Sequence, residues 1–124
     1  MDAFLWVLAV LLSVVFLAAG LPKLVRSKAE LLESGQWFAP RLPEGVMRVA
    51  GVAEVAAAVG LVAPAVLGVA PVLVPLAASG IVLLEAGAAF VHAREGLYKL
   101  VTVNLTLAGL AFLIACQRFG PYAL

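Results

Sequence analysis

The sequence predicts an all-α integral membrane protein, a four-helix bundle whose neighbouring helices are antiparallel. Three observations support this prediction: the composition, four long apolar segments, and the positions of the basic residues. Of the 124 residues, 65% are hydrophobic and 12% are charged, and the mean hydropathy is +1.17. Because a soluble domain is about a quarter charged, these residues cannot build a water-soluble surface. We expect a single transmembrane domain over residues 1–124.

Four segments are long enough to cross a membrane, which takes about 20 largely apolar residues. Their approximate bounds are residues 3–24, 44–62, 66–91 and 97–116. The first segment has no basic residue before its apolar stretch, and that stretch is longer than the core of a cleaved signal peptide. We therefore expect it to be retained as a spanning helix.

Prolines indicate where the second and third spanning helices begin, end or bend. Pro43 suits the start of the second helix, and Pro64 is expected to follow its end. Pro71 and Pro75 fall early in the third predicted helix, where they should bend or loosen it. The short connection around Pro64 makes these two helices antiparallel neighbours.

The stretch SKAELLESG, between the first two spans, is predicted to form a short amphipathic helix. Ser27 suits its N-cap, with Glu30 three residues later, and Gly35 suits its end. Trp37 and Phe38 would then lie at the depth of the lipid head groups, as interfacial aromatic residues do. A simple surface loop is the alternative.

The basic residues predict the orientation of the chain. Most lie in or beside the first and third connections, which share one side of the membrane: Lys23, Arg26, Lys28, Arg41, Arg48, Arg94 and Lys99. Near the termini only Arg118 is basic. Because basic residues concentrate in cytoplasmic connections, we expect both termini on the non-cytoplasmic side of the cell membrane.

The few polar residues within or beside the spans are all predicted to lie in the cytoplasmic half of the bundle. All four helices contribute to this set, which is Lys23, Arg48, Glu54, Glu85, His92 and Asn104. A charged side chain at this depth costs about 2.5 kcal/mol or more unless it is paired, hydrated or neutralised. We therefore expect a polar pocket near the cytoplasmic side.

The candidate catalytic residues are Glu54, Glu85 and His92. Glu85 and His92 are separated by seven residues and so share one helical face. Two carboxylates in one apolar pocket should not both ionise freely, so we expect one to bind a proton or a cation. Glu85, kept protonated by burial, would suit a general acid, with His92 relaying protons to the cytoplasm.

Lys23, Arg48 and Asn104 are the candidate ligand-binding or supporting residues. Lys23 and Arg48 are either interfacial anchors or ion-pair partners, and Lys23 is the candidate counter-ion of Glu54. Asn104 suits a hydrogen bond between helices. For Glu54, a purely structural ion pair is the alternative to an acid with a function.

The sequence indicates no metal site and no nucleic-acid partner, and it leaves any cofactor unknown. Two Glu, one His and one Asn could ligate a divalent ion. However, di-iron bundles place Glu and His three residues apart, whereas the spacing from Glu85 to His92 is seven. The lone Cys116 excludes an internal disulfide. The net charge of +1, without a basic run, does not suggest binding to nucleic acid.

Four short motifs resemble the DoxX-like family of small four-helix integral membrane proteins. In chain order they are AGLPKL, RVAGVAEVAAAVGLV, GAAFVHAREG and VTVNLTLAG, one for each predicted span. The resemblance covers nearly the whole chain. Lys23, Glu54, His92 and Asn104 fall on matching positions, whereas Glu85 has no assigned position in the family pattern.

The resemblance implies a four-helix membrane bundle and leaves three functions open. Some family members are associated with membrane redox complexes or quinone-linked oxidation. This implies a redox-associated membrane subunit that binds a lipophilic quinone-like molecule or a membrane or soluble redox partner. The first alternative is a membrane-embedded enzyme that does acid–base chemistry on a lipophilic substrate, as an isomerase, a cyclase or an epoxide hydrolase. The second is a non-catalytic assembly factor. Homo-oligomerisation is left open.

Overall fold

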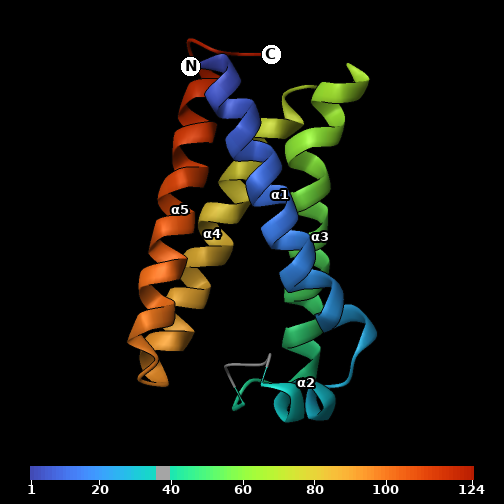
Figure 1. Cartoon of the computed structure of the whole chain (residues 1–124), viewed down its shortest axis with the longest axis vertical. Helices are drawn as coiled ribbons and strands as arrows, with labels where there is room; N and C mark the ends of the chain where they lie inside the picture. Colours follow the sequence, from blue (N-terminus) through green and yellow to red (C-terminus); the bar gives the residue numbers. More distant parts are fainter. Residues whose placement is uncertain (36–39) are drawn as a thin grey trace.

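The computed structural model describes residues 1–35 and 40–124, and this part of the chain forms five α-helices. Figure 1 shows them in chain order, which is α1 (Asp2–Val25), α2 (Lys28–Ser34), α3 (Glu44–Leu67), α4 (Leu73–Arg94) and α5 (Tyr98–Phe119). All except α2 are long and apolar enough to cross a membrane. The predicted all-α architecture with four spanning candidates is therefore confirmed, and so is contact with a lipid bilayer.

The boundary between the second and third long helices differs from the prediction. Pro64 lies inside α3, within its last turn, and the helix continues to Leu67. A proline fixes its own φ near the helical value, so the chain can stay helical beyond it until Gly68 adopts a left-handed conformation with φ 66°. Pro71 consequently lies in the connecting turn before α4, and Pro75 lies in the first turn of α4, where a helix needs no backbone donor.

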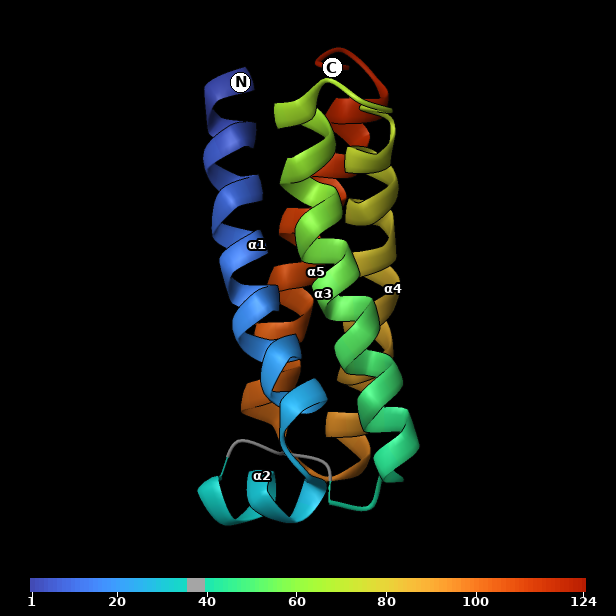
Figure 2. The ribbon, with the colours of Figure 1, turned by 90° about the vertical axis from the view of Figure 1, so that its right-hand side faces the viewer.

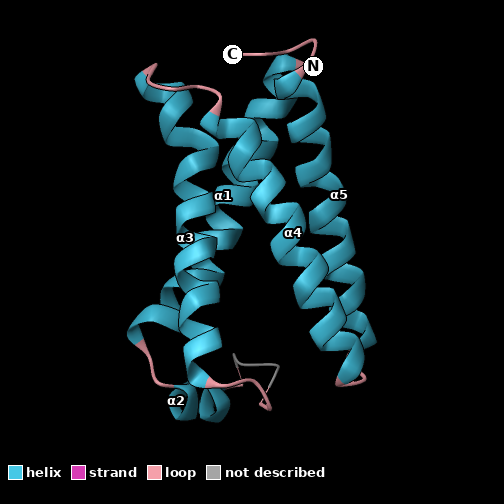
Figure 3. Cartoon of the chain, turned by 180° about the vertical axis from the view of Figure 1, so that it is seen from behind, coloured by secondary structure: helices cyan, strands magenta, loops and turns pink. Residues whose placement is uncertain are grey.

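The four long helices associate as two pairs, α1 with α3 and α4 with α5. Contacts between α3 and α4 join the pairs, whereas α1 and α5 touch less extensively. Both termini lie at one end of the bundle and α2 at the other, which we call the α2 end (Figures 1 and 2). Toward the α2 end the two pairs diverge, as Figures 1 and 3 show.

The main apolar core lies between the four long helices. Its largest buried side chains come from every one of them and include Leu5, Phe16, Leu61, Ile81 and Ile114. Between α1 and α3, the Ser13 hydroxyl donates to the Ala58 carbonyl oxygen at 2.8 Å. The core thus packs the two helix pairs against each other between the α2 end and the end with the termini.

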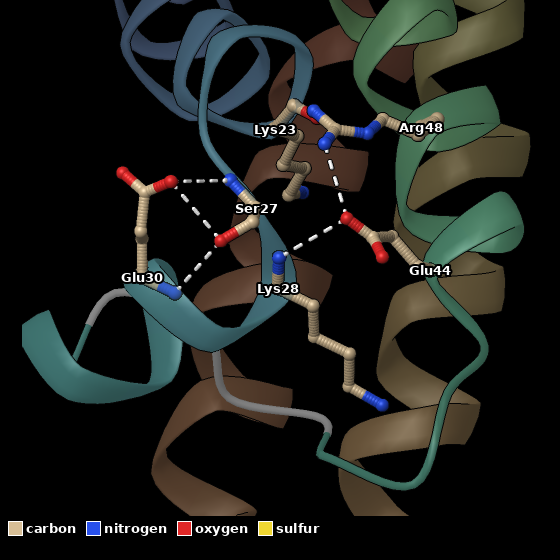
Figure 4. Close-up of polar contacts among 6 residues, drawn as sticks. All are labelled: Lys23, Ser27, Lys28, Glu30, Glu44 and Arg48. Atoms are coloured by element: carbon tan, nitrogen blue, oxygen red, sulfur yellow. Dashed lines mark hydrogen bonds and ion pairs between the residues drawn. The ribbon is translucent and has the colours of Figure 1, made fainter.

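The short helix α2 confirms the amphipathic helix predicted between the first two spans. The Ser27 hydroxyl accepts a hydrogen bond from the Glu30 backbone N–H, and the Glu30 carboxylate accepts one from the Ser27 N–H (Figure 4). Gly35 ends the helix with φ 75°. One buried side chain, Leu31, packs against Met47 of α3. Trp37 and Phe38 fall outside the described residues.

Candidate functional site

The first polar group of the candidate site joins α1 to α3. The Lys23 Nζ atom lies 2.5 Å from Glu54 Oε1, and the whole Glu54 residue is only 8% exposed. Glycines on both helices make this pair possible. A Cβ atom added to Gly51 would lie 2.9 Å from the Lys23 Cβ, and one added to Gly20 would lie 2.9 Å from the Gly51 carbonyl oxygen. Because only glycine fits here, the backbones approach closely enough for Lys23 to reach Glu54.

One buried atom of this group lacks a hydrogen-bond partner among the described residues. The second carboxylate oxygen of Glu54, Oε2, is buried and has no hydrogen-bond partner among residues 1–35 and 40–124. An unsatisfied buried acceptor costs about 1–3 kcal/mol, and more when it is charged. This atom therefore marks the place where a further hydrogen-bond donor would gain most.

Arg48 supports the first group from the side. Its Nη1 donates to the Lys23 carbonyl oxygen at 2.7 Å, and its Nη2 donates to Glu44 Oε1 at 3.1 Å (Figure 4). The Lys23 carbonyl lies in the last turn of α1, where carbonyls lack a partner within the helix. Arg48 thus holds the end of α1 and the backbone of Lys23. In this structure its guanidinium binds Lys23 and Glu44, and its role in supporting a ligand site stays a prediction.

The second polar group joins α4 to α5. Asn104 of α5 donates from Nδ2 to Glu85 Oε2 at 2.7 Å, and its Oδ1 lies 2.6 Å from His92 Nδ1. Since an amide oxygen only accepts, His92 Nδ1 carries the hydrogen of that bond. Glu85 and Asn104 are buried, whereas His92 is half-buried in the last turn of α4. A line of donors therefore runs from the half-exposed imidazole to the buried Glu85 carboxyl.

Each of the six polar residues predicted from the sequence belongs to one of these two groups. The structure thus brings the predicted polar residues together as two hydrogen-bonded groups, one on each helix pair. Two carboxylates, an ammonium, an amide and an imidazole can bind a polar head group or move protons.

A groove with an apolar lining lies elsewhere in the described part of the bundle. This groove of about 1050 Å³ runs between α3 and α4, and small or aliphatic side chains line it, among them Ala56, Gly60, Ala77 and Gly80. Several of its lining residues, such as Leu83, are exposed on the lipid-facing surface. None of the six predicted polar residues lines this groove. The polar pocket inferred from the sequence therefore stays a prediction.

A buried cation at the opposite end of the bundle was missed by sequence reasoning. The Arg118 side chain is 3% exposed, and its Nη1 donates to Asp2 Oδ1 at 2.5 Å and to the Tyr122 carbonyl oxygen at 2.9 Å. Its guanidinium also lies over the Trp6 ring, 6.0 Å from the centroid. The signal in the sequence was Asp2 in the first turn of the first span and Arg118 in the last turn of the fourth. A chain with four spans brings its two ends to the same side, so these two residues can meet.

Comparison with known proteins supports the architecture. A model of the DoxX-like family matches residues 7–114, a range that includes residues of all four long helices. No curated protein and no solved structure matches the chain significantly. Within the matched range lie Lys23, Glu54, Glu85 and Asn104, so both polar groups belong to the family domain.

Proposed function

This chain belongs to the DoxX-like family, and we propose that it is a redox-associated membrane protein that binds a lipophilic, quinone-like molecule. The proposed site lies between the two helix pairs, in the half of the bundle near the α2 end. Glu54 contacts the quinone head group from the α1–α3 side. The side chains that contact it from the α4–α5 side are Glu85, His92 and Asn104.

The observation that carries this proposal is the buried Glu54 Oε2 atom without a hydrogen-bond partner among the described residues. A polar atom held in an apolar environment recovers its desolvation cost when a donor reaches it. Ligand sites combine apolar walls with a few such convergent polar groups. The ribbons of the two pairs also diverge toward the α2 end, as Figure 3 shows.

Native mass spectrometry of the protein released from lipid nanodiscs tests the proposal. We expect the wild type to carry a co-purified quinone, or to bind an added benzoquinone or naphthoquinone with a short isoprenoid tail. Glu54→Leu should lose that ligand. Val52→Leu is the matched control, because Val52 lies on the same helix and is 58% exposed toward lipid. A wild type that binds none of these quinones would overturn the proposal.

A membrane-embedded enzyme is the second candidate, favoured by the line of donors from His92 through Asn104 to Glu85. A buried carboxyl linked to a half-exposed imidazole suits acid–base chemistry on a lipophilic substrate. Glu54, Glu85 and His92 would then be catalytic, with Lys23, Arg48 and Asn104 in support.

Glu85→Gln separates this candidate from a structural role. In an enzyme it should abolish turnover of a lipophilic epoxide or olefin, followed by mass spectrometry, and leave the melting temperature in detergent nearly unchanged. A large fall in melting temperature would instead favour a group that only fixes helix packing, as in an assembly factor.

We also propose that the chain lies in the cell membrane with its α2 end in the cytoplasm and both termini outside, so that successive spans are antiparallel. Of its eight Lys and Arg residues, Arg118 alone belongs to the end that carries the termini. Basic residues are retained on the cytoplasmic side during insertion. A C-terminal alkaline phosphatase should be active and a C-terminal green fluorescent protein dark. The opposite result would reverse the orientation.

A further inference from the structure

We infer that the proposed site binds the reduced, hydroquinone form of its ligand more tightly than the oxidised quinone form. This inference rests on the proposed function and adds the redox state of the ligand to it. It follows from whether the unpartnered buried atom of the two polar groups is a hydrogen-bond donor or an acceptor.

The donor nitrogens of the second group that the structure shows in hydrogen bonds already have partners within the group. Asn104 Nδ2 donates to Glu85 at 2.7 Å, and His92 Nδ1 donates to the Asn104 amide oxygen at 2.6 Å. The buried side-chain atom left without a partner in the described part of the chain is Glu54 Oε2. A carboxylate oxygen accepts hydrogen bonds and donates none. The buried, unpartnered atom that these residues offer a ligand is therefore an acceptor.

The two redox forms of a quinone differ in this respect. A hydroquinone carries two hydroxyl groups, each of which can donate a hydrogen bond, whereas a quinone carries two carbonyl oxygens that only accept. A hydroquinone hydroxyl placed on Glu54 Oε2 satisfies both atoms. A quinone carbonyl at the same place would bring two acceptors together without a hydrogen between them and leave both unsatisfied.

The charge on Glu54 strengthens this discrimination. The Lys23 ammonium lies 2.5 Å from Oε1, so the carboxylate is paired as an anion and its other oxygen stays an acceptor. Hydrogen bonds to a charged acceptor are roughly twice as strong as those between neutral groups. Lys23 is the cation through which a quinone could still be held, so its variant is part of the test.

The expected preference is large enough to measure. Sites built to bind a hydroxyl group reject an analogue that lacks it by factors of about 10⁴, and we expect at least about tenfold here. Each tenfold preference for the reduced form raises the midpoint potential of a bound two-electron couple by about 30 mV. The redox change itself takes up two electrons and two protons from outside the site, and no covalent step involves the protein.

The test compares decyl-benzoquinone with its hydroquinone, each titrated anaerobically against protein-loaded and empty nanodiscs. The wild type should bind the hydroquinone at least about tenfold more tightly. In Glu54→Gln, whose amide both donates and accepts, the two affinities should agree within about threefold. Val52→Leu should keep the wild-type ratio. A redox titration of the bound ligand on the wild type needs no variant and should show the raised potential.

The outcomes separate this inference from the proposed function. Equal affinities, or a preference for the quinone that disappears in Lys23→Met, would overturn the inference while the proposed site stands. Binding of neither form would overturn both. A preference for the hydroquinone that survives in Glu54→Gln would also overturn the inference, because the selectivity would then come from other groups.

Discussion

The Lys23–Glu54 pair shows how two charges are tolerated at membrane depth. Each is desolvated by the helix contact around Gly20 and Gly51, and each is compensated chiefly by the other, at 2.5 Å. Removing one partner of such a pair is costly because it strands the other charge, whereas removing both leaves no charge to strand. The pair therefore determines that α1 and α3 pack against each other, and it adds little to the stability of the protein.

The first prediction follows from this balance. Lys23→Met should lower the free energy of unfolding by about 3 kcal/mol, because the Glu54 carboxylate loses its counter-ion. The double variant Lys23→Met/Glu54→Leu should recover at least half of that loss. Unfolding in mixed detergent micelles, followed by circular dichroism, measures both. A double variant less stable than either single variant would contradict the ion-pair assignment.

Asn104 is the residue on which the second polar group depends. It is buried and bonds both Glu85 and His92. Asn104→Leu should destabilise the protein by about 1–3 kcal/mol, since Glu85 Oε2 loses its donor in an apolar environment. Thr106→Val is the control, because the exposed Thr106 hydroxyl only donates to the Thr102 carbonyl of its own helix. Similar melting temperatures for the two variants would show that the Asn104 bonds contribute little.

At the scale of elements, sequence motifs predicted those helices whose ends are determined by interactions between nearby residues. The capping box of Ser27 and Glu30 and the left-handed Gly35 determine α2 within a few residues, so sequence reasoning identified that helix. The end of α3 depended instead on two competing signals. Pro64 predicts that the helix ends before it. However, a proline is compatible with the last turn of a helix, and α3 ends only at Gly68, which caps it.

The pairing of the helices could not be predicted in the same way. Helical periodicity shows that Glu85 and His92 share a face, but not that this face meets Asn104. The sequence did offer Lys23 as the counter-ion of Glu54, as an alternative to an interfacial anchor, and the structure shows that pair. The six polar residues were therefore predicted as one cluster, whereas they form two groups on separate helix pairs. Arg118 was missed because its partner Asp2 lies at the other end of the chain, beyond the reach of any local pattern.

The contact between α1 and α3 gives an element-scale prediction. Gly51→Ala would place a Cβ 2.9 Å from the Lys23 Cβ, so the helices must separate and the Lys23–Glu54 pair must lengthen. We expect a loss of about 1–3 kcal/mol, as for other overpacked cores. Gly109→Ala, where the new methyl group meets nothing within 4 Å, should cost nothing. Thermal unfolding in detergent compares them, and equal melting temperatures would mean that the helices are not in close contact here.

At the scale of the whole molecule, the two helix pairs are held together differently at the two ends. At the end with the termini, Arg118 of α5 binds Asp2 of α1 and lies over Trp6. At the α2 end, Arg41 approaches Glu95 to only 3.8 Å, and its side chain is 82% exposed. Exposed ion pairs contribute about 0–1 kcal/mol. Val91 of α4 also packs against the buried Leu31 and Met47 at the α2 end. We expect the end with the termini, which we call the closed end, to be held more firmly, and the α2 end to be where the pairs would separate to admit the proposed ligand.

Two arginine substitutions test this asymmetry, because Arg118 and Arg41 both bridge the helix pairs and differ in burial. Arg118→Leu should cost about 1–3 kcal/mol, since it leaves the Tyr122 carbonyl without its donor and removes the guanidinium from the Trp6 ring. Arg41→Leu should change stability by less than about 1 kcal/mol. Spin labels placed on α1 and α5 near the termini should move apart in the first variant and stay in place in the second. If the Arg41 variant instead separates the pairs or loses more stability than the Arg118 variant, the closed end is the α2 end, and a ligand would have to enter from the termini.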